Sequence, residues 1–410
     1  MRRPSLWLLL VVVLLGVLIL RDPRLRLLDD RLLAWFMQRT PANLPPAPVT
    51  QVEIGREDFQ SLVPAEERKP LSGGEAGRRS LSPLEYGLFL QAVLEFQPAV
   101  IGIEPLLVWR NRDKIQEQVL LDQAMRVPKL LVSLRLGGKG HRDLSPEELP
   151  TMPNVIGSRG DLPSFNGIAQ QPDDDLRLIS TPGFINMPDD SSDPIRVPML
   201  FEYQGEIVPS FTLEAIMLWL RATPADVKVV LGSEILLPNG WKIPLHRDGT
   251  TTINPAARQS VHRLTLGELL LAAQEREQHR PATRELGNLN DQIVLLRLVG
   301  DPLQPANVFA SAIATIQNNA YIRPASPKVG WLIILLALLL ASFYRRISRS
   351  GWFLGAIIVT AGYALVEMAL LSRERVWLPF LLPIGLLWFL VIVRWFDRGG
   401  TVKPEITAQD

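Results

Sequence analysis

The chain has 410 residues, enough for two or three ordinary domains. Its 43 basic and 42 acidic residues give a formal net charge of +1, so no global basic field indicates a nucleic-acid partner. Cysteine is absent, which excludes disulfide frameworks, thiolate catalysis and thiolate-bound zinc or iron–sulfur sites.

An apolar run at residues 6–20 follows Arg2 and Arg3 near the start of the chain. A run shorter than about 20 residues is also typical of a secretory signal, but the next residues, 21–24, contain no small side chains for a signal peptidase. We therefore expect a retained transmembrane anchor at residues 1–22.

Three further apolar stretches crowd the region 328–396, at residues 329–344, 352–371 and 376–393. Tryptophans stand at their ends, where an amphipathic ring prefers the level of the lipid headgroups. Short connections predict antiparallel neighbours, and four spans place both termini on one side. An ionisable Glu367 inside the third span is expected to reach the headgroups or to pair with Arg373.

Basic residues near the span ends are nearly balanced between the two sides of the membrane. The short amino terminus and the basic loop 345–351 favour cytoplasmic termini, because long domains are translocated largely regardless of charge. The sequence thus predicts a multi-pass protein of the bacterial inner membrane, with residues 23–327 exported to the periplasm and a short cytoplasmic tail at residues 397–410.

The exported region alternates strands and helices. It begins with a short amphipathic helix at 26–37, and a strand follows at 49–54. Ser82-Pro83-Leu84-Glu85 then predicts the start of a helix, by its capping residue, its proline and its acid. The next predicted elements are a strand at 99–103, a helix at 116–125 and a strand at 129–134. This order predicts an α/β domain, in which helices flank a partly parallel sheet.

The later elements are expected to be more mixed. A predicted strand at 196–203 precedes a helix at 210–220, and Asn239-Gly240 predicts a tight turn between short antiparallel strands. We expect these strands at 228–231, 235–237 and 241–245. A helix at 264–278, a buried strand at 292–298 and a helix at 307–317 complete the domain.

No motif for catalysis is evident, and we expect neither enzyme activity nor a cofactor nor a metal centre. The four histidines are scattered, without the spacing of a metal site. The acidic clusters 173–175 and 189–193 offer oxygen ligands of the kind that calcium prefers, but neither has the order of a known calcium loop. Solvated acidic turns are the favoured interpretation.

Several stretches in order along the chain resemble one family. Residues 86–107 are similar to its helix and apolar strand ending in an acid, here Glu104. Its other motifs resemble Gly183–Asn186, residues 189–193 with Arg196, residues 209–212, residues 243–249 and residues 253–254. The family is the CHASE domain of the second type, an extracytoplasmic sensory module associated with cyclases and histidine kinases. Two motifs depart from it: Ser82-Pro83-Leu84 replaces a tryptophan-proline-arginine segment, and the glycine-rich loop is reduced to residues 299–303.

The resemblance implies a membrane-anchored sensor of an envelope signal. Members commonly continue into an output domain, whereas residues 394–410 are too short to form one. We therefore expect the signal to pass through the lipid-embedded helices to a separate protein, such as a cyclase, a kinase or another membrane-complex subunit; a homodimer stays open. The expected ligand-binding residues are Glu104, Asp189, Asp193 and Arg196. The alternative is a non-sensing envelope scaffold or subunit of a membrane complex.

Overall fold

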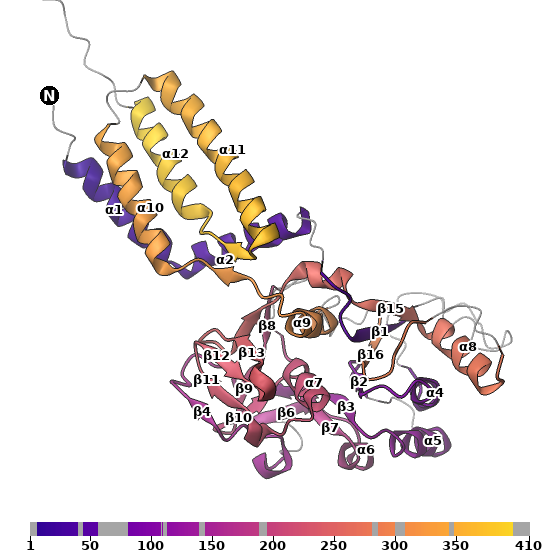
Figure 1. Cartoon of the computed structure of the whole chain (residues 1–410). Helices are drawn as coiled ribbons and strands as arrows, with labels where there is room; N and C mark the ends of the chain where they lie inside the picture. The colour runs from indigo at the N-terminus through magenta and orange to yellow at the C-terminus, as the bar shows by residue number, and fades with distance from the viewer. Residues whose placement is uncertain are drawn as a thin grey trace, which may run out of the picture. The chain divides into compact units, whose positions relative to one another are not determined.

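The computed structural model describes residues 6–39, 44–55, 81–107, 109, 113–138, 144–187, 195–280, 286–299, 308–343 and 348–396. Its contacts divide the chain into two compact units (Figure 1). One unit is residues 43–321, and the other combines residues 1–42 with residues 322–410. The sequence predicts a boundary after residue 22, whereas the structure groups the following helix with the terminal helices.

A seven-stranded sheet forms the centre of the unit 43–321. Its strand order is β15-β1-β16-β2-β3, and both β6 and β7 pair with β3. Its members are β1 (Val49–Ile54), β2 (Val100–Ile103), β3 (Leu130–Gly137), β6 (Gly167–Gln170), β7 (Thr181–Phe184), β15 (His262–Thr265) and β16 (Ile293–Leu298). All pairs in this sheet are parallel except β3 with β6. The predicted α/β class with a partly parallel sheet is therefore confirmed.

Helices cover both faces of this sheet, and the alternation of strand side chains assigns each helix to a face. One apolar cluster joins Val52, Ile103 and Leu296 to three helices, α4 (Pro83–Leu94), α5 (Lys114–Ala124) and α8 (Leu266–Glu277). A second cluster joins the intervening strand residues Val49 and Leu295 to α7 (Phe211–Leu220) and α9 (Val308–Gln317). The sheet is thus the middle of three layers (Figure 1).

Local sequence signals explain several element boundaries. Glu85 accepts a hydrogen bond from the backbone N–H of Ser82 at 2.6 Å, which closes the predicted capping arrangement at the start of α4. At the predicted hairpin turn, Asn239 and Gly240 have φ angles of 59° and 78°. Asparagine and glycine tolerate this left-handed backbone better than other residues, so the turn forms where the sequence predicts it.

Short antiparallel strands form the rest of this unit. β9 (Leu200–Tyr203) pairs with β10 (Glu206–Pro209), and β11 (Lys228–Val230), β12 (Glu234–Leu236) and β13 (Lys242–Pro244) form a meander. β8 (Arg196–Pro198) pairs with β14 (Thr250–Thr252). β4 (Val155–Ile156) and β5 (Ser164–Phe165) add parallel pairs to β11 and β9. The predicted mixture of parallel and antiparallel pairing is therefore present.

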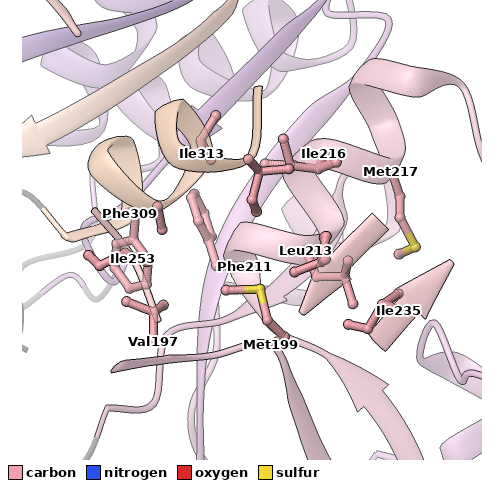
Figure 2. Close-up of a cluster of buried hydrophobic side chains, with 14 of the residues drawn as sticks. Val197, Met199, Phe211, Leu213, Ile216, Met217, Ile235, Ile253, Phe309 and Ile313 are labelled. Carbon is pink, nitrogen blue, oxygen red and sulfur yellow. The ribbon is translucent and has the colours of Figure 1, made fainter. Parts of the chain in front are cut away.

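A single apolar cluster ties α7 and α9 to these short strands. Figure 2 shows Phe211 and Ile216 of α7 together with Phe309 and Ile313 of α9. The rings of Phe211 and Phe309 lie 5.3 Å apart between their centroids. The same cluster contains Val197 of β8, Ile235 of β12 and Met199, which lies between β8 and β9. Because these side chains are buried together, α7 and α9 form one rigid layer on the sheet.

Two glycines of the sheet allow α7 to approach it closely. A Cβ atom placed on Gly102 of β2 would lie 2.6 Å from Leu295 Cδ2 and 3.1 Å from the ring of Phe211. A Cβ on Gly183 of β7 would lie 2.8 Å from the same ring. Side chains at these positions would therefore force α7 away from the sheet.

The second unit is helical. It comprises α1 (Leu6–Arg21), α2 (Pro23–Arg39), α10 (Pro327–Ser342), α11 (Arg349–Arg373) and α12 (Leu381–Phe396). Its apolar core includes Val12, Ile334, Trp352 and Leu386. Within the described residues, one helix, α11, is both long and apolar enough to cross a bilayer. The other predicted spans, α1, α10 and α12, are apolar helices of 16 residues each, so four transmembrane helices are not confirmed.

Candidate functional site

Charged side chains gather at the carboxyl ends of the central strands. Glu53 of β1 stands opposite Arg297 of β16 in the parallel register. On the other side of β16, Ile103 pairs with Leu296, and the N–H of Glu104 donates to the carbonyl of Leu296 at 3.1 Å. Alternation along each strand places all three charged residues on the face covered by α7 and α9. Arg297 therefore lies between two glutamates on neighbouring strands.

This charged row is largely shielded from water. Glu104 is 2% exposed and Arg297 is 7% exposed, while Glu53 is half-buried. Arg263 of β15 lies on the same face, beside β1, and extends the row. Burial, with the neighbouring cations Arg258 and Arg297, lowers the pKa of the Arg263 guanidinium, and the Glu53 carboxylate opposes this shift. The charges at this edge therefore influence one another.

Two uncharged side chains fix the backbone around the row. The Ser133 hydroxyl donates to the carbonyl of Pro105 at 2.9 Å and holds the segment that follows Glu104. Asn186, after β7, donates to the carbonyl of Leu136 at 2.9 Å and accepts from its N–H at 2.7 Å. The motif Gly183–Asn186 therefore has a structural role at this edge, through the close approach of Gly183 to α7 and the two-way bond of Asn186.

The structure describes two of the four expected ligand-binding residues, Glu104 and Arg196. Glu104 lies in the charged row. Arg196 lies on β8, outside the central sheet, and its guanidinium is 3.9 Å from the Asp248 carboxylate. Asp189 and Asp193 lie outside the described residues. The structure thus places Glu104 and Arg196 on different sheets, and their joint role in binding stays a prediction.

The other predicted acidic cluster, at residues 173–175, opens the short helix α6 (Asp174–Leu178). Arg177 forms ion pairs with Asp174 at 3.7 Å and with Glu148 at 3.0 Å. Among the described residues, no group of three potential ligands could hold a metal ion. The cluster therefore lies at the start of a helix, where Arg177 pairs with one of its carboxylates.

Sequence reasoning did not identify Arg297 or Glu53 as site residues. One signal was available, because Arg297 interrupts the aliphatic strand of residues 292–298. Arginine is rarely buried unless its charge is paired. Gln51 and Glu53 likewise alternate with aliphatic residues in β1. The sequence does not show the order of the strands in the sheet. Arg297 comes to lie between Glu53 and Glu104 only because β16 inserts between β1 and β2.

A second unusual group in this unit is the carboxyl of Glu214, on α7. Only 4% of the residue is exposed, and its Oε2 atom has no hydrogen-bond partner among the described residues. Burial raises the pKa of Glu214 from 4.5 to about 8. The group is therefore protonated at neutral pH in the folded chain.

In the helical unit, a carboxylate of α2 binds the turn between α11 and α12. Asp29 Oδ1 accepts from the backbone N–H groups of Phe380 and Leu381 at 3.1 and 3.2 Å. Asp29 Oδ2 accepts from Trp377 Nε1 at 3.0 Å. Burial raises the pKa of the Asp29 carboxyl, and the three hydrogen bonds oppose the shift. This carboxylate also meets the N-terminus of α12, where a negative charge is stabilising.

Other segments of the unit bind the same turn. The N–H of Arg323 donates to the carbonyl of Arg375 at 2.9 Å, and the N–H of Ala325 donates to that of Trp377 at 2.8 Å. These bonds join β17 (Arg323–Pro324) to β18 (Val376–Trp377) in parallel. The carboxylate of Glu367, inside α11, accepts from the N–H of Leu378 at 2.9 Å, a partner that the sequence does not predict.

Comparison with known proteins gives one match. Residues 8–344 match the family model described as CHASE2 domain, which is more than half of the 410-residue chain. No similar protein was found among curated proteins, and none among solved structures.

Proposed function

Because the chain belongs to the CHASE2 domain family and carries its extracytoplasmic sensory domain, we propose that it is a membrane-anchored bacterial sensor. The unit 43–321 responds to a signal in the cell envelope. Four helices of the other unit, α1, α10, α11 and α12, cross the inner membrane and pass the response to a separate protein, a cyclase, a kinase or another membrane-complex subunit. The charged row at the carboxyl edge of the sheet is the site that receives the signal, and the protein performs no catalysis.

The observation that carries the signalling part is the turn between α11 and α12. The chain passes between the two units twice, after α2 and after Tyr321. Each passage adjoins an element that is hydrogen-bonded to this turn. α2 is bound through Asp29, and the segment after Tyr321 is bound through Arg323 and Ala325. A displacement that moves α2 or β17 would therefore act on hydrogen bonds at one place, residues 375–381. A ligand shifts such an arrangement only by binding two states with different affinity.

The membrane placement can be tested with single cysteines, because the natural chain has none. Glu206→Cys and Ser350→Cys place thiols at exposed positions of the two units. In spheroplasts, a membrane-impermeant maleimide should label the thiol at position 206, whereas the thiol at position 350 should react only after lysis. Labelling in the opposite order would reject the proposed orientation.

Coupling between the turn and the sensory unit can be tested by reciprocity, because a perturbation at one coupled site must change the other. In Asp29→Asn, the amide nitrogen cannot accept from Trp377 Nε1, so the turn is loosened. We expect faster hydrogen exchange within residues 308–317 as well as at the turn, in full-length protein in lipid nanodiscs. Glu374→Gln, at an exposed carboxylate beside the turn, is the matched control.

Exchange confined to the turn in Asp29→Asn would reject coupling and leave the scaffold interpretation. That interpretation also predicts a stoichiometric partner that copurifies with the wild type and with Asp29→Asn alike.

A further inference from the structure

Gln51 and Arg297, one beside the charged row and one within it, have buried polar atoms that lack hydrogen-bond partners among the described residues. Gln51 is fully buried, and neither Oε1 nor Nε2 of its amide has a hydrogen-bond partner among the described residues. The same holds for Nε of Arg297, which is 7% exposed. Leaving such groups unpaired costs free energy, so native proteins rarely do it without a bound water, an ion or a ligand.

Gln51 and Arg297 belong to neighbouring strands and share one face of the sheet. Gln51 pairs with Leu295 in the register of β1 and β16, and Arg297 stands two residues further along, opposite Glu53. Neighbouring strands are about 4.8 Å apart, so the long side chains of Gln51 and Arg297 can reach one ligand. In open parallel sheets with helices on both faces, ligands bind outside the carboxyl ends of the strands. Glu53 and Arg297 lie near these ends, and Gln51 is buried two residues before Glu53.

The types of side chain define the ligand. A guanidinium binds a carboxylate or a phosphate through paired N–H donors, and the Gln51 amide adds one donor and one acceptor. A ligand that is only an anion would be repelled by Glu53 and Glu104, which flank Arg297 on both sides. In a ligand with both an anionic and a cationic group, the anionic group would meet Arg297 and the cationic group would meet the glutamates.

We propose that Gln51, Glu53 and Arg297 bind a small zwitterion with a carboxylate and a protonated amine, as in a free α-amino acid. Arg297 and the Gln51 amide hold the carboxylate, and Glu53, with the charge of Glu104 nearby, holds the amine. This inference rests on the proposed sensory function, because it names the class of signal that the site receives.

The test is a thermal-unfolding screen of the full-length protein in detergent with the twenty common amino acids, one at a time, followed by calorimetric titration of any that stabilise it. At least one amino acid should raise the unfolding temperature. Its N-acetyl derivative, which lacks the cation, and its amide, which lacks the carboxylate, should bind at least about tenfold more weakly. No stabilising amino acid, or equal binding of either derivative, would overturn the proposal.

Variants assign the effect to the site. Arg297→Lys keeps the charge but loses the paired donors, and we expect a loss of affinity of roughly 10- to 100-fold. Arg177→Gln, in which another largely buried arginine is lost from α6, should bind like the wild type. Equal binding by wild type and Arg297→Lys would also overturn the proposal.

Gln51→Leu supplies a readout that does not depend on affinity alone. It removes two unpaired polar atoms, so the ligand-free protein should unfold at a higher temperature while its response to the amino acid is lost. A lower unfolding temperature without ligand would mean that Gln51 is satisfied within the chain, and the proposal would fail. Because all these measurements are made in detergent, they are independent of the membrane orientation and of the coupling tested above.

Discussion

The two faces of the central sheet differ in the polarity of the residues at the carboxyl ends of their strands. On the face covered by α4, α5 and α8, the strand residues stay aliphatic to the carboxyl end, as in Ile54, Ile103, Leu134 and Leu296. On the face covered by α7 and α9, β1, β2, β3 and β16 each begin with an apolar residue, and polar residues follow. The polar residues of this face include Gln51, Glu53, Glu104, Ser133 and Arg297, and Arg263 of β15 lies beside them.

This difference shows how one sheet can be both a core and a site. Burial of the first face stabilises the fold throughout its length, at about 25 cal/mol per Å² of apolar surface removed from water. The second face stabilises the fold only at the amino ends of its strands. At the carboxyl ends it holds charges whose burial costs stability, which is the usual property of a binding site.

The largest effect should come from the face covered by α4, α5 and α8, whose strand residues are mostly aliphatic. Phe89 of α4 is fully buried in the cluster of that face. Phe89→Ala removes a ring and leaves a cavity, so we expect the free energy of unfolding to fall by about 3–5 kcal/mol. Denaturant titration of the full-length protein measures this loss. A loss below about 1 kcal/mol would mean that this face is not the principal core.

The buried carboxyl of Glu214, on the opposite face, should make stability depend on pH. Its pKa is raised to about 8 in the folded chain, above the 4.5 of an exposed glutamate. The folded state therefore binds more protons than the unfolded state between these values, and stability falls as pH rises from about 4.5 to about 8. Between pH 5 and pH 8 the loss should be on the order of 3 kcal/mol.

Glu214→Gln should remove this dependence, because the amide does not titrate. Unfolding free energies of the two proteins across pH 5–8 provide the comparison, with Glu206→Gln as a control at an exposed glutamate of the same unit. Parallel pH profiles for the wild type and Glu214→Gln would show that the carboxyl is ionised in the folded protein.

The close contact of α7 with the sheet predicts a smaller loss. In Gly102→Ala, the new Cβ would lie 2.6 Å from Leu295 Cδ2, and the Phe211 ring would also have to move. Overpacking of this kind costs about 1–3 kcal/mol. Gly205→Ala, at a glycine with open space around it but a φ of 86°, separates backbone strain from crowding. If Gly102→Ala is as stable as the wild type, α7 is not tightly held.

The central strands were predictable because their signals are local. Alternation of polar and apolar residues identified β1, and an aliphatic run identified β16. The capping sequence at Ser82 identified the start of α4. β15 was missed, and its residues were partly assigned to the helix at 264–278. His262 and Arg263 give this short edge strand little apolar character, and Thr265 also caps α8 through the N–H of Glu268.

The candidate sites were less predictable, because they depend on pairing between distant segments. Glu104 was expected because residues 86–107 resemble the family's helix and apolar strand ending in an acid. Arg297 becomes its neighbour only because β16 inserts between β1 and β2. Asp29 and Trp377 are 348 residues apart in the chain. Hydropathy indicates that both segments belong to apolar surroundings but cannot indicate that one binds the other.

The smallest effect should come from Arg196, the predicted site residue that lies outside the central sheet. Its guanidinium is 3.9 Å from Asp248, and the two side chains are 37% and 44% exposed. Exposed pairs of this kind contribute about 0–1 kcal/mol, since water screens the attraction and two long side chains must be ordered. Arg196→Gln should therefore change the free energy of unfolding by less than about 1 kcal/mol in denaturant titration. A loss several times larger would mean that Arg196 contributes as much to stability as a core residue does. The contrast between the two faces of the sheet would then not explain which residues stabilise this domain.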